Sequence, residues 1–215
     1  MQISWNGLGS FTISGKPTQG EVKLITDPYQ SSLGLKLSRV LSADLVVSSH
    51  DGEMANNIAA IASPDNKKQF HIHHAGEYEV SGIFVTGIEA KLANGDQHTI
   101  YKFELEDIAV GFLGAIDREL TDKELELLGA VDILLLPVGG ERVLNAKSAA
   151  LLVAKIEPRI VVPSYFYTDG LKIKLDPANA FIKEVGAPVE EVNKIKISRS
   201  GLPQEEMKIM LLSRS

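Results

Sequence analysis

The stretch SADLVVSSHDGEMANN, residues 42–57, decides how the chain is interpreted. Its apolar run Leu45-Val46-Val47 leads through two serines to His50, the pattern of a buried strand that places a histidine at its carboxyl end. The apolar spacing that follows predicts a helix from about Met54 to Ala62. In α/β proteins, side chains just beyond such strand ends often carry the chemistry. The stretch therefore predicts a functional edge at His50.

The rest of the chain predicts a mixed α/β fold in which short strands come first and strand–helix alternation follows. Thr121 and Glu124 form a capping box for a helix that ends at Gly129. A second helix is expected over 146–156, and a third after Asp176 as its cap, with Pro177 at its first position. We expect strands at 1–5, 11–14, 22–26, 44–48, 70–74, 83–88, 99–105, 108–112, 131–136, 160–163, 195–198 and 208–212. No linker or repeat divides the chain, so residues 1–215 are interpreted as a single domain.

Composition narrows the classes of function. The 215 residues include 44% hydrophobic and 23% charged residues and no cysteine, which excludes disulfides and cysteine zinc sites. A net charge of -6 argues against a nucleic-acid-binding protein. No signal peptide or membrane-spanning run is visible, so we expect a cytoplasmic protein with no membrane partner.

Several short motifs follow one another along the chain. In order they are WNGLGSF at 5–11, ITDPY at 25–29, SH at 49–50, GEYEV at 76–80, TIY at 99–101, LG at 113–114, VDILLLPVGG at 131–140 and VVP at 161–163. This series resembles the metallo-β-lactamase superfamily, and within it the compact, lactonase-like branch of zinc-dependent hydrolases. The resemblance covers nearly the whole chain. It implies a four-layer αββα sandwich with a site at the sheet edge.

The positions at which that family holds metal carry few donors here. The family signature His-x-His-x-Asp-His begins at His50, but its later ligands fall on Gly52, Met54 and Ala55. Three other family positions, a bridging Asp, a late His and an early His, fall on Ala115, Tyr165 and Leu8. The middle ligand His has no clear match, with His98 as a displaced candidate.

Catalytic zinc usually keeps three protein ligands, and it lowers the pKa of bound water to about 7. His50 alone is too few, so the sequence predicts that the dinuclear zinc site has been lost and that no cofactor is present. The resulting expectation is a non-catalytic protein that binds a small molecule or a protein partner. Asp27, Asp117 and Tyr165 are expected around its pocket.

A second hypothesis keeps the chemistry. His50, Asp51, Glu53 and His98 are candidate ligands for one rebuilt site holding zinc or another divalent metal, with His50 or Asp51 as the catalytic base. The protein would then be a metal-dependent hydrolase of a small ester, lactone or phosphorylated metabolite. A third hypothesis is a structural subunit of a homo-oligomer, because open sheet edges favour pairing.

Two other patterns near this edge are interpreted as structural. In His71-Ile72-His73-His74, a continuous strand would place His71 and His73 on one face and His74 on the other, which predicts a polar strand face or a subunit contact. Ser48 and Ser49 adjoin His50, but neighbouring residues are poorly placed for a Ser–His relay.

Overall fold

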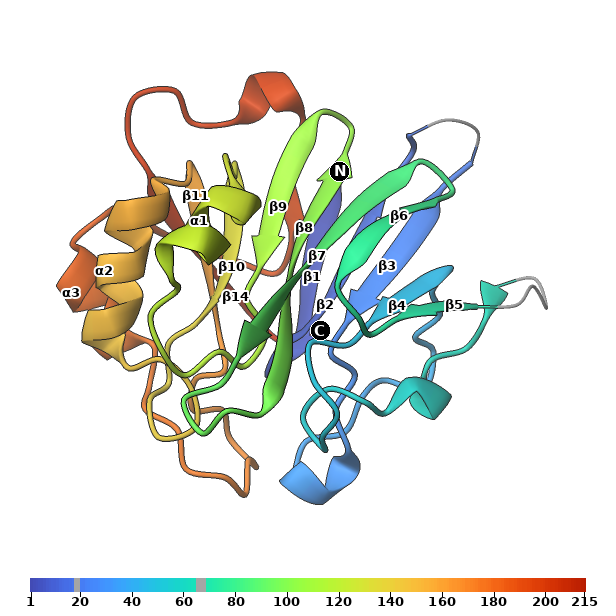
Figure 1. Ribbon diagram of the computed structural model, residues 1–215, viewed down its shortest axis with the longest axis horizontal. Coiled ribbons are helices and arrows are strands. Elements are labelled where there is room, and N and C mark those ends of the chain that lie inside the picture. Colours follow the sequence, from blue (N-terminus) through green and yellow to red (C-terminus); the bar gives the residue numbers. More distant parts are fainter. Residues whose placement is uncertain (18–19, 65–68) are drawn as a thin grey trace.

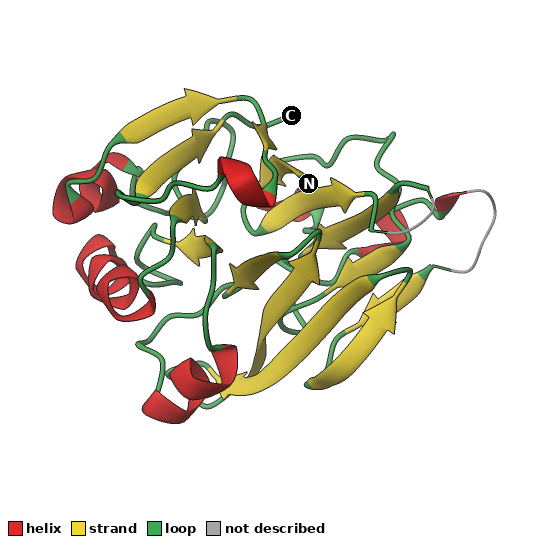
Figure 2. Ribbon diagram, turned by 90° about the horizontal axis from the view of Figure 1, so that it is seen from above, coloured by secondary structure: helices red, strands yellow, loops and turns green. Residues whose placement is uncertain are grey.

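The computed structural model describes residues 1–17, 20–64 and 69–215. Two mixed sheets lie face to face (Figures 1 and 2). The first has the order β13 (Ile195–Lys196), β1 (Gln2–Gly7), β2 (Ser10–Gly15), β3 (Val22–Thr26), β4 (Leu45–Val47) and β5 (Phe70–Ile72). The second has the order β12 (Val189–Val192), β14 (Lys208–Leu212), β11 (Ile160–Ser164), β10 (Ile133–Pro137), β9 (Ile108–Phe112), β8 (Gln97–Leu105), β7 (Ile83–Lys91) and β6 (Gly76–Val80).

The main core lies between the two sheets. Trp5 and Phe11 of the first sheet and Phe103 and Phe112 of the second belong to one buried cluster. A second cluster joins the outer face of the second sheet to the helices through Leu152 and other apolar side chains. The expected sandwich is therefore confirmed in its two sheets and its helical layer.

Three α-helices cover the second sheet (Figure 1): α1 (Asp122–Leu128), α2 (Ala146–Ile156) and α3 (Asn179–Val185). The predicted capping box of α1 is present, since the Thr121 side chain and the Glu124 backbone N–H are bonded and the Glu124 carboxylate reaches back to the Thr121 N–H. Over the first sheet the described elements are short 3-10 turns, η1 (Ser31–Leu33) and η2 (Ile58–Ala60); a third, η4 (Arg199–Gly201), lies near the carboxyl end. No described helix is long and apolar enough to cross a bilayer.

The helix predicted from Met54 to Ala62 is wrong. The Gly52 carbonyl accepts from the backbone N–H groups of Ala55 and Asn56, which closes a turn. The backbone N–H of Asn57 donates to the Pro28 carbonyl at 2.7 Å, where a helix would bond within itself. Contacts with the loop after β3 therefore override the helical spacing, and η2 is what remains.

Two smaller predictions also need correction. Asp176 does not cap α3, because the N-cap is Ala178 and the Asp176 backbone N–H donates to the Gly139 carbonyl at 2.6 Å. Residues 76–80, which were not among the predicted strands, form the strand β6, which pairs with β7. The Asp176 contact is with chain distant in sequence, which local spacing does not encode, whereas β6 and β7 form a hairpin that turns at Ser81 and Gly82.

Candidate functional site

The site lies where the carboxyl ends of three parallel strands meet. β4 pairs in parallel with β3 on one side and β5 on the other, so the residues that follow all three strands reach the same edge of the sheet. Asp27 follows β3, Ser49 and His50 follow β4, and His73 follows β5. The second sheet meets this edge through β8, because the Thr99 backbone N–H donates to the Ser49 carbonyl at 2.7 Å. His50 therefore lies at a sheet edge, as the sequence predicted.

A pocket of about 720 Å³ opens at this edge. All five histidines of the chain line it, together with two carboxylates: His50, His71, His73, His74, His98, Asp51 and Glu89. A concave site with several convergent polar groups is the usual form of a ligand or active site. The gathering of every imidazole in one pocket is the strongest chemical feature of the molecule.

His50 is held on one side and free on the other. Its Nδ1 lies 2.9 Å from the Ser49 hydroxyl oxygen, and its Nε2 has no hydrogen-bond partner in the described chain. Burial lowers the pKa of His50, and the nearby Asp51 carboxylate only partly offsets this effect. The imidazole is therefore kept toward its neutral, electron-donating form. Ser49 thus contacts His50, but it is buried and also bonded to Asp27, so no exposed Ser–His relay is formed.

His98 carries a buried nitrogen without a partner. The ring is 2% exposed, and its Nε2 lies 2.8 Å from the Leu113 carbonyl. A carbonyl only accepts, so Nε2 carries the proton and Nδ1 presents a lone pair. That Nδ1 is buried and makes no hydrogen bond. Burial lowers the pKa of His98 to about 4, so the ring is neutral at physiological pH.

The remaining histidines form a stacked group at the mouth of the pocket. β5 ends at Ile72, so the strand geometry predicted through His74 is wrong. The ring centres of His71 and His73 are 4.7 Å apart, and those of His73 and His74 are 3.8 Å apart. His71 Nε2 also lies 3.1 Å from the Ser48 hydroxyl. The three rings are therefore part of the pocket wall.

The family positions that lack donors lie together in an apolar cluster. Leu8, Ala115 and Tyr165 are each at most 1% exposed and belong to one hydrophobic group, against which Met54 packs. The Tyr165 hydroxyl donates to the Asp27 carboxylate at 3.0 Å. Burial, and then the neighbouring carboxylate, raise the pKa of Tyr165, so its phenolate is not available as a metal ligand. Tyr165 and Asp27 thus lie behind the pocket rather than in its wall.

The other carboxylates predicted from sequence are distributed unevenly. Asp51 lines the pocket and accepts from the Asn56 amide at 2.5 Å. Glu53 lies outside it and accepts from the Ser32 hydroxyl at 3.1 Å. Asp117 also lies elsewhere, because it accepts from the Ala93 backbone N–H at 2.8 Å in the turn between β7 and β8. Glu89, which spacing did not single out, reaches the pocket from the end of β7.

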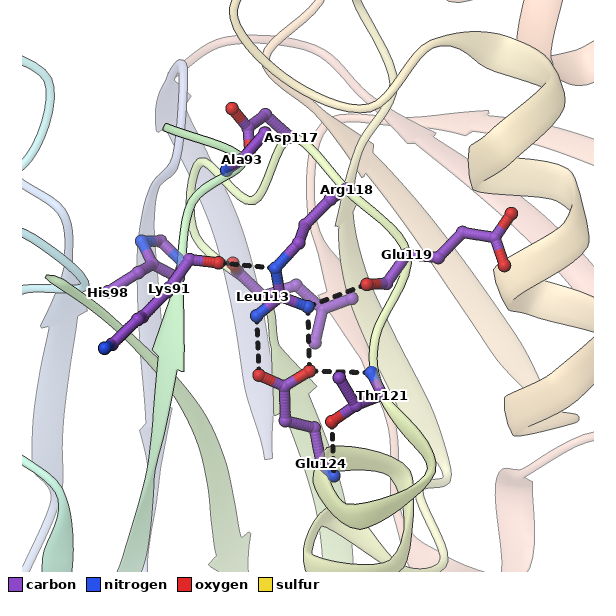
Figure 3. Close-up of polar contacts among 9 residues, drawn as sticks. All are labelled: Lys91, Ala93, His98, Leu113, Asp117, Arg118, Glu119, Thr121 and Glu124. Carbon is purple, nitrogen blue, oxygen red and sulfur yellow. Dashed lines mark hydrogen bonds and ion pairs between the residues drawn. The ribbon is translucent and has the colours of Figure 1, made fainter. Parts of the chain in front are cut away.

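An arginine behind His98 ties the second sheet to α1. Figure 3 shows Arg118 between the Lys91 carbonyl and the Glu124 carboxylate. The guanidinium donates to Lys91 O at 2.6 Å and to the two Glu124 oxygens at 2.7 and 2.9 Å. This bidentate pair fixes the end of β7 that delivers Glu89 and holds α1 beside it.

The pocket brings two imidazoles close enough to contact one divalent cation, but its described residues hold no complete set of ligands. No three His, Asp or Glu side chains of the described residues already surround one point. The ring centres of His50 and His98 are 5.8 Å apart, and the buried Nδ1 of His98 has no hydrogen-bond partner within the described chain. With metal–nitrogen distances of about 2.0–2.1 Å and about 1 Å more to each ring centre, one ion spans two rings about 6 Å apart. Water or a pocket carboxylate such as Asp51 would complete the coordination.

Comparison with known proteins supports a metal-dependent family. The sequence profile of the β-lactamase superfamily domain matches residues 2–165. A UPF0173 metal-dependent hydrolase from Pyrococcus horikoshii is 32% identical over 125 residues, which is 54% of each chain, so the match spans about half of that relative. A UPF0173 metal-dependent hydrolase from Thermococcus onnurineus is 26% identical over 204 residues, 80% of this chain and 89% of the relative.

Solved structures agree in fold. A proposed Zn-dependent hydrolase of the metallo-β-lactamase superfamily from Thermotoga maritima aligns with a TM-score of 0.79, 24% identity and coverage of 99% of this chain and 100% of that one. A metallo hydrolase from Ignicoccus hospitalis aligns at 0.64 with 18% identity, covering 86% of this chain and 90% of that one.

These relatives overturn the first functional hypothesis. The prediction of a non-catalytic binding protein that has lost its metal chemistry is wrong, because relatives matched over 54% and 80% of this chain are named metal-dependent hydrolases. The reasoning failed because it counted donors only at the motif positions. The histidines that follow β5 and begin β8 stand outside that motif, and they line the same pocket as His50.

Proposed function

The chain belongs to the metallo-β-lactamase superfamily, and from that premise we propose that it is a metal-dependent hydrolase of a small ester, lactone or phosphorylated metabolite. One observation carries the proposal: the buried His98 imidazole keeps an unpartnered Nδ1, 5.8 Å between ring centres from His50, in a pocket lined by every histidine of the chain. A buried polar atom without a partner is rare and requires an explanation. A cation that this nitrogen helps to bind provides one.

His50 and His98 would hold the metal, with Asp51 as the nearest carboxylate in sequence. A bound divalent ion supplies Lewis acidity and lowers the pKa of its water to about 7. Both imidazoles stay neutral in the folded protein because burial lowers the pKa of each, and a neutral ring is the form that binds metal. No proton therefore has to leave either ring before its lone pair can bind a metal at neutral pH.

The remaining wall shapes the substrate position. Ser48 donates to the Ala55 carbonyl at 2.8 Å, so its oxygen accepts from His71 Nε2–H and His71 Nδ1 is left with its lone pair. Burial lowers the pKa of His71, which keeps that nitrogen able to take a proton from a bound nucleophile. The apolar cluster around Leu8 lies behind this wall and does not line the pocket.

Metal content tests the proposal directly. Protein purified without an affinity tag is dialysed against zinc, manganese or iron and assayed by elemental analysis. We expect about one ion per chain in the wild type and loss of the ion in His98→Gln, whose amide can still donate to the Leu113 carbonyl. His74→Gln is the matched control at the exposed mouth and should retain the ion.

Activity is then measured with an activated carboxylic ester, a simple γ-lactone and an activated phosphomonoester. We expect hydrolysis of at least one, abolished by chelation and restored by metal. Wild-type protein that binds no metal and hydrolyses none of the three would refute the proposal.

A further inference from the structure

A buried carboxylate and a serine lie behind His50 and form one chain of hydrogen bonds. Asp27 is 0% exposed, and its two oxygens accept from the Ser49 backbone N–H and the Ser49 hydroxyl, each at 2.7 Å. The Ser49 oxygen lies 2.9 Å from His50 Nδ1. Nothing in the proposed chemistry uses Asp27 or Ser49, yet together they contact the ring that faces the pocket.

From this geometry we infer that Asp27 and Ser49 are positioning residues that set the tautomer of His50, so that its Nε2 lone pair faces the pocket. Above about pH 7 the Asp27 carboxylate is ionised and only accepts hydrogen bonds, so the single hydroxyl proton of Ser49 then points to Asp27. The Ser49 oxygen can then only accept from His50, which places the proton on Nδ1. Nε2 is left as the free donor of an electron pair. The inference rests on the proposed function only for the purpose of the free Nε2, which is to bind metal. The tautomer of His50 can be measured whether or not metal binds.

Two glycines make this arrangement possible. A Cβ added at Gly114 would lie 2.4 Å from both the Ser49 Cβ and the Ser49 oxygen, and Gly114 has a φ of +58°. A larger residue there would displace the serine. A Cβ at Gly52 would lie 3.3 Å from His50 Nε2. Glycine at this position, where the family signature has a ligand, leaves the outer side of Nε2 open.

Tyr165 supplies a further hydrogen bond to the Asp27 carboxylate. Its hydroxyl donates to the Asp27 oxygen that also accepts from Ser49, at 3.0 Å. That oxygen is therefore supplied with two donors, and the other accepts from the Ser49 backbone. Burial raises the pKa of Asp27 to about 7, so the tautomer is best measured at pH 9, where the carboxyl group is ionised.

The experiment is ¹⁵N-detected NMR of the histidine rings in metal-free protein at pH 9, with His50 assigned by its absence in His50→Gln. In the wild type we expect a protonated, pyrrole-type Nδ1 and an unprotonated, pyridine-type Nε2. Asp27→Asn should reverse them. The asparagine oxygen must still accept from the Ser49 N–H, so its amide donates to the Ser49 hydroxyl and turns that proton toward His50.

Matched variants separate this role from general packing. Ser49→Ala should lose the Nδ1–H form, and Ser49→Thr should restore it. Ser48→Ala is the control, because Ser48 also contacts a histidine but has no bond to Asp27. A wild-type His50 that is protonated on Nε2, or an Asp27→Asn spectrum like that of the wild type, would overturn the inference. Failure of metal binding with the expected tautomer would instead refute only the proposed function.

Discussion

Removing the charge of Asp27 should change how the stability of the protein depends on pH. The carboxyl group is fully buried and lies beside Tyr165, with no cation in contact. Burial is the largest influence and raises its pKa from 3.8 to about 7, against the hydrogen bonds from Ser49 and Tyr165 that lower it. In the folded state the group therefore keeps its proton over a pH range in which the unfolded chain has lost it.

The sign and size follow from proton linkage. Between about pH 4 and pH 7 the folded state binds the extra proton, so the free energy of unfolding falls as pH rises, by about 1.4 kcal/mol per pH unit. The contribution is fully present below pH 4, is lost by about pH 7 and totals roughly 4 kcal/mol. His98 acts in the opposite direction over part of this range, because burial lowers its pKa to about 4. A wild-type profile alone therefore mixes two opposing effects.

A difference measurement isolates Asp27. Urea unfolding of the wild type and Asp27→Asn is compared from pH 4 to pH 9, and the contribution of His98 is common to both proteins. We expect similar stabilities near pH 4 and an advantage for Asp27→Asn that grows to a few kcal/mol above pH 7. Asp51→Asn controls for loss of one exposed negative charge. A difference that does not vary with pH would refute the assignment of a buried, neutral Asp27.

Three further predictions concern the supports of the site. Tyr165→Phe removes a donor to Asp27 that lowers its pKa, so the pH-dependent transition should move to higher pH in the same urea experiment. Arg118→Ala leaves the buried Glu124 carboxylate without its bidentate partner and should lower the free energy of unfolding by about 1–3 kcal/mol, with Arg118→Lys intermediate. Gly114→Ala combines a left-handed φ with a 2.4 Å contact and should destabilise by about 2 kcal/mol or more, measured by thermal unfolding.

Local signals predicted the elements whose determinants are local. The capping box at Thr121 specifies where α1 begins, and the apolar spacing of 146–156 gives α2 with the predicted bounds. The strand over 108–112 was likewise predicted with its observed ends. The residues that specify each of these elements lie within a few positions of one another, so the sequence alone is enough to predict the element. The order of the short motifs along the chain also predicted the superfamily fold.

Tertiary structure decided the site. His50 follows a buried strand, and its placement at a sheet edge was predictable from sequence. Its meeting with His98, 48 positions away, required two sheets to close on each other, and the motif spacing gave no sign of it. The parallel pairing of β4 with β5 within the first sheet brought the β5 histidines to the pocket, and bonds from Asn57 to Pro28 and Tyr29 drew residues 54–62 out of a helix. Hydrogen bonds and imidazole contacts between distant segments depend on where strands end in space, and that is a property of the folded chain.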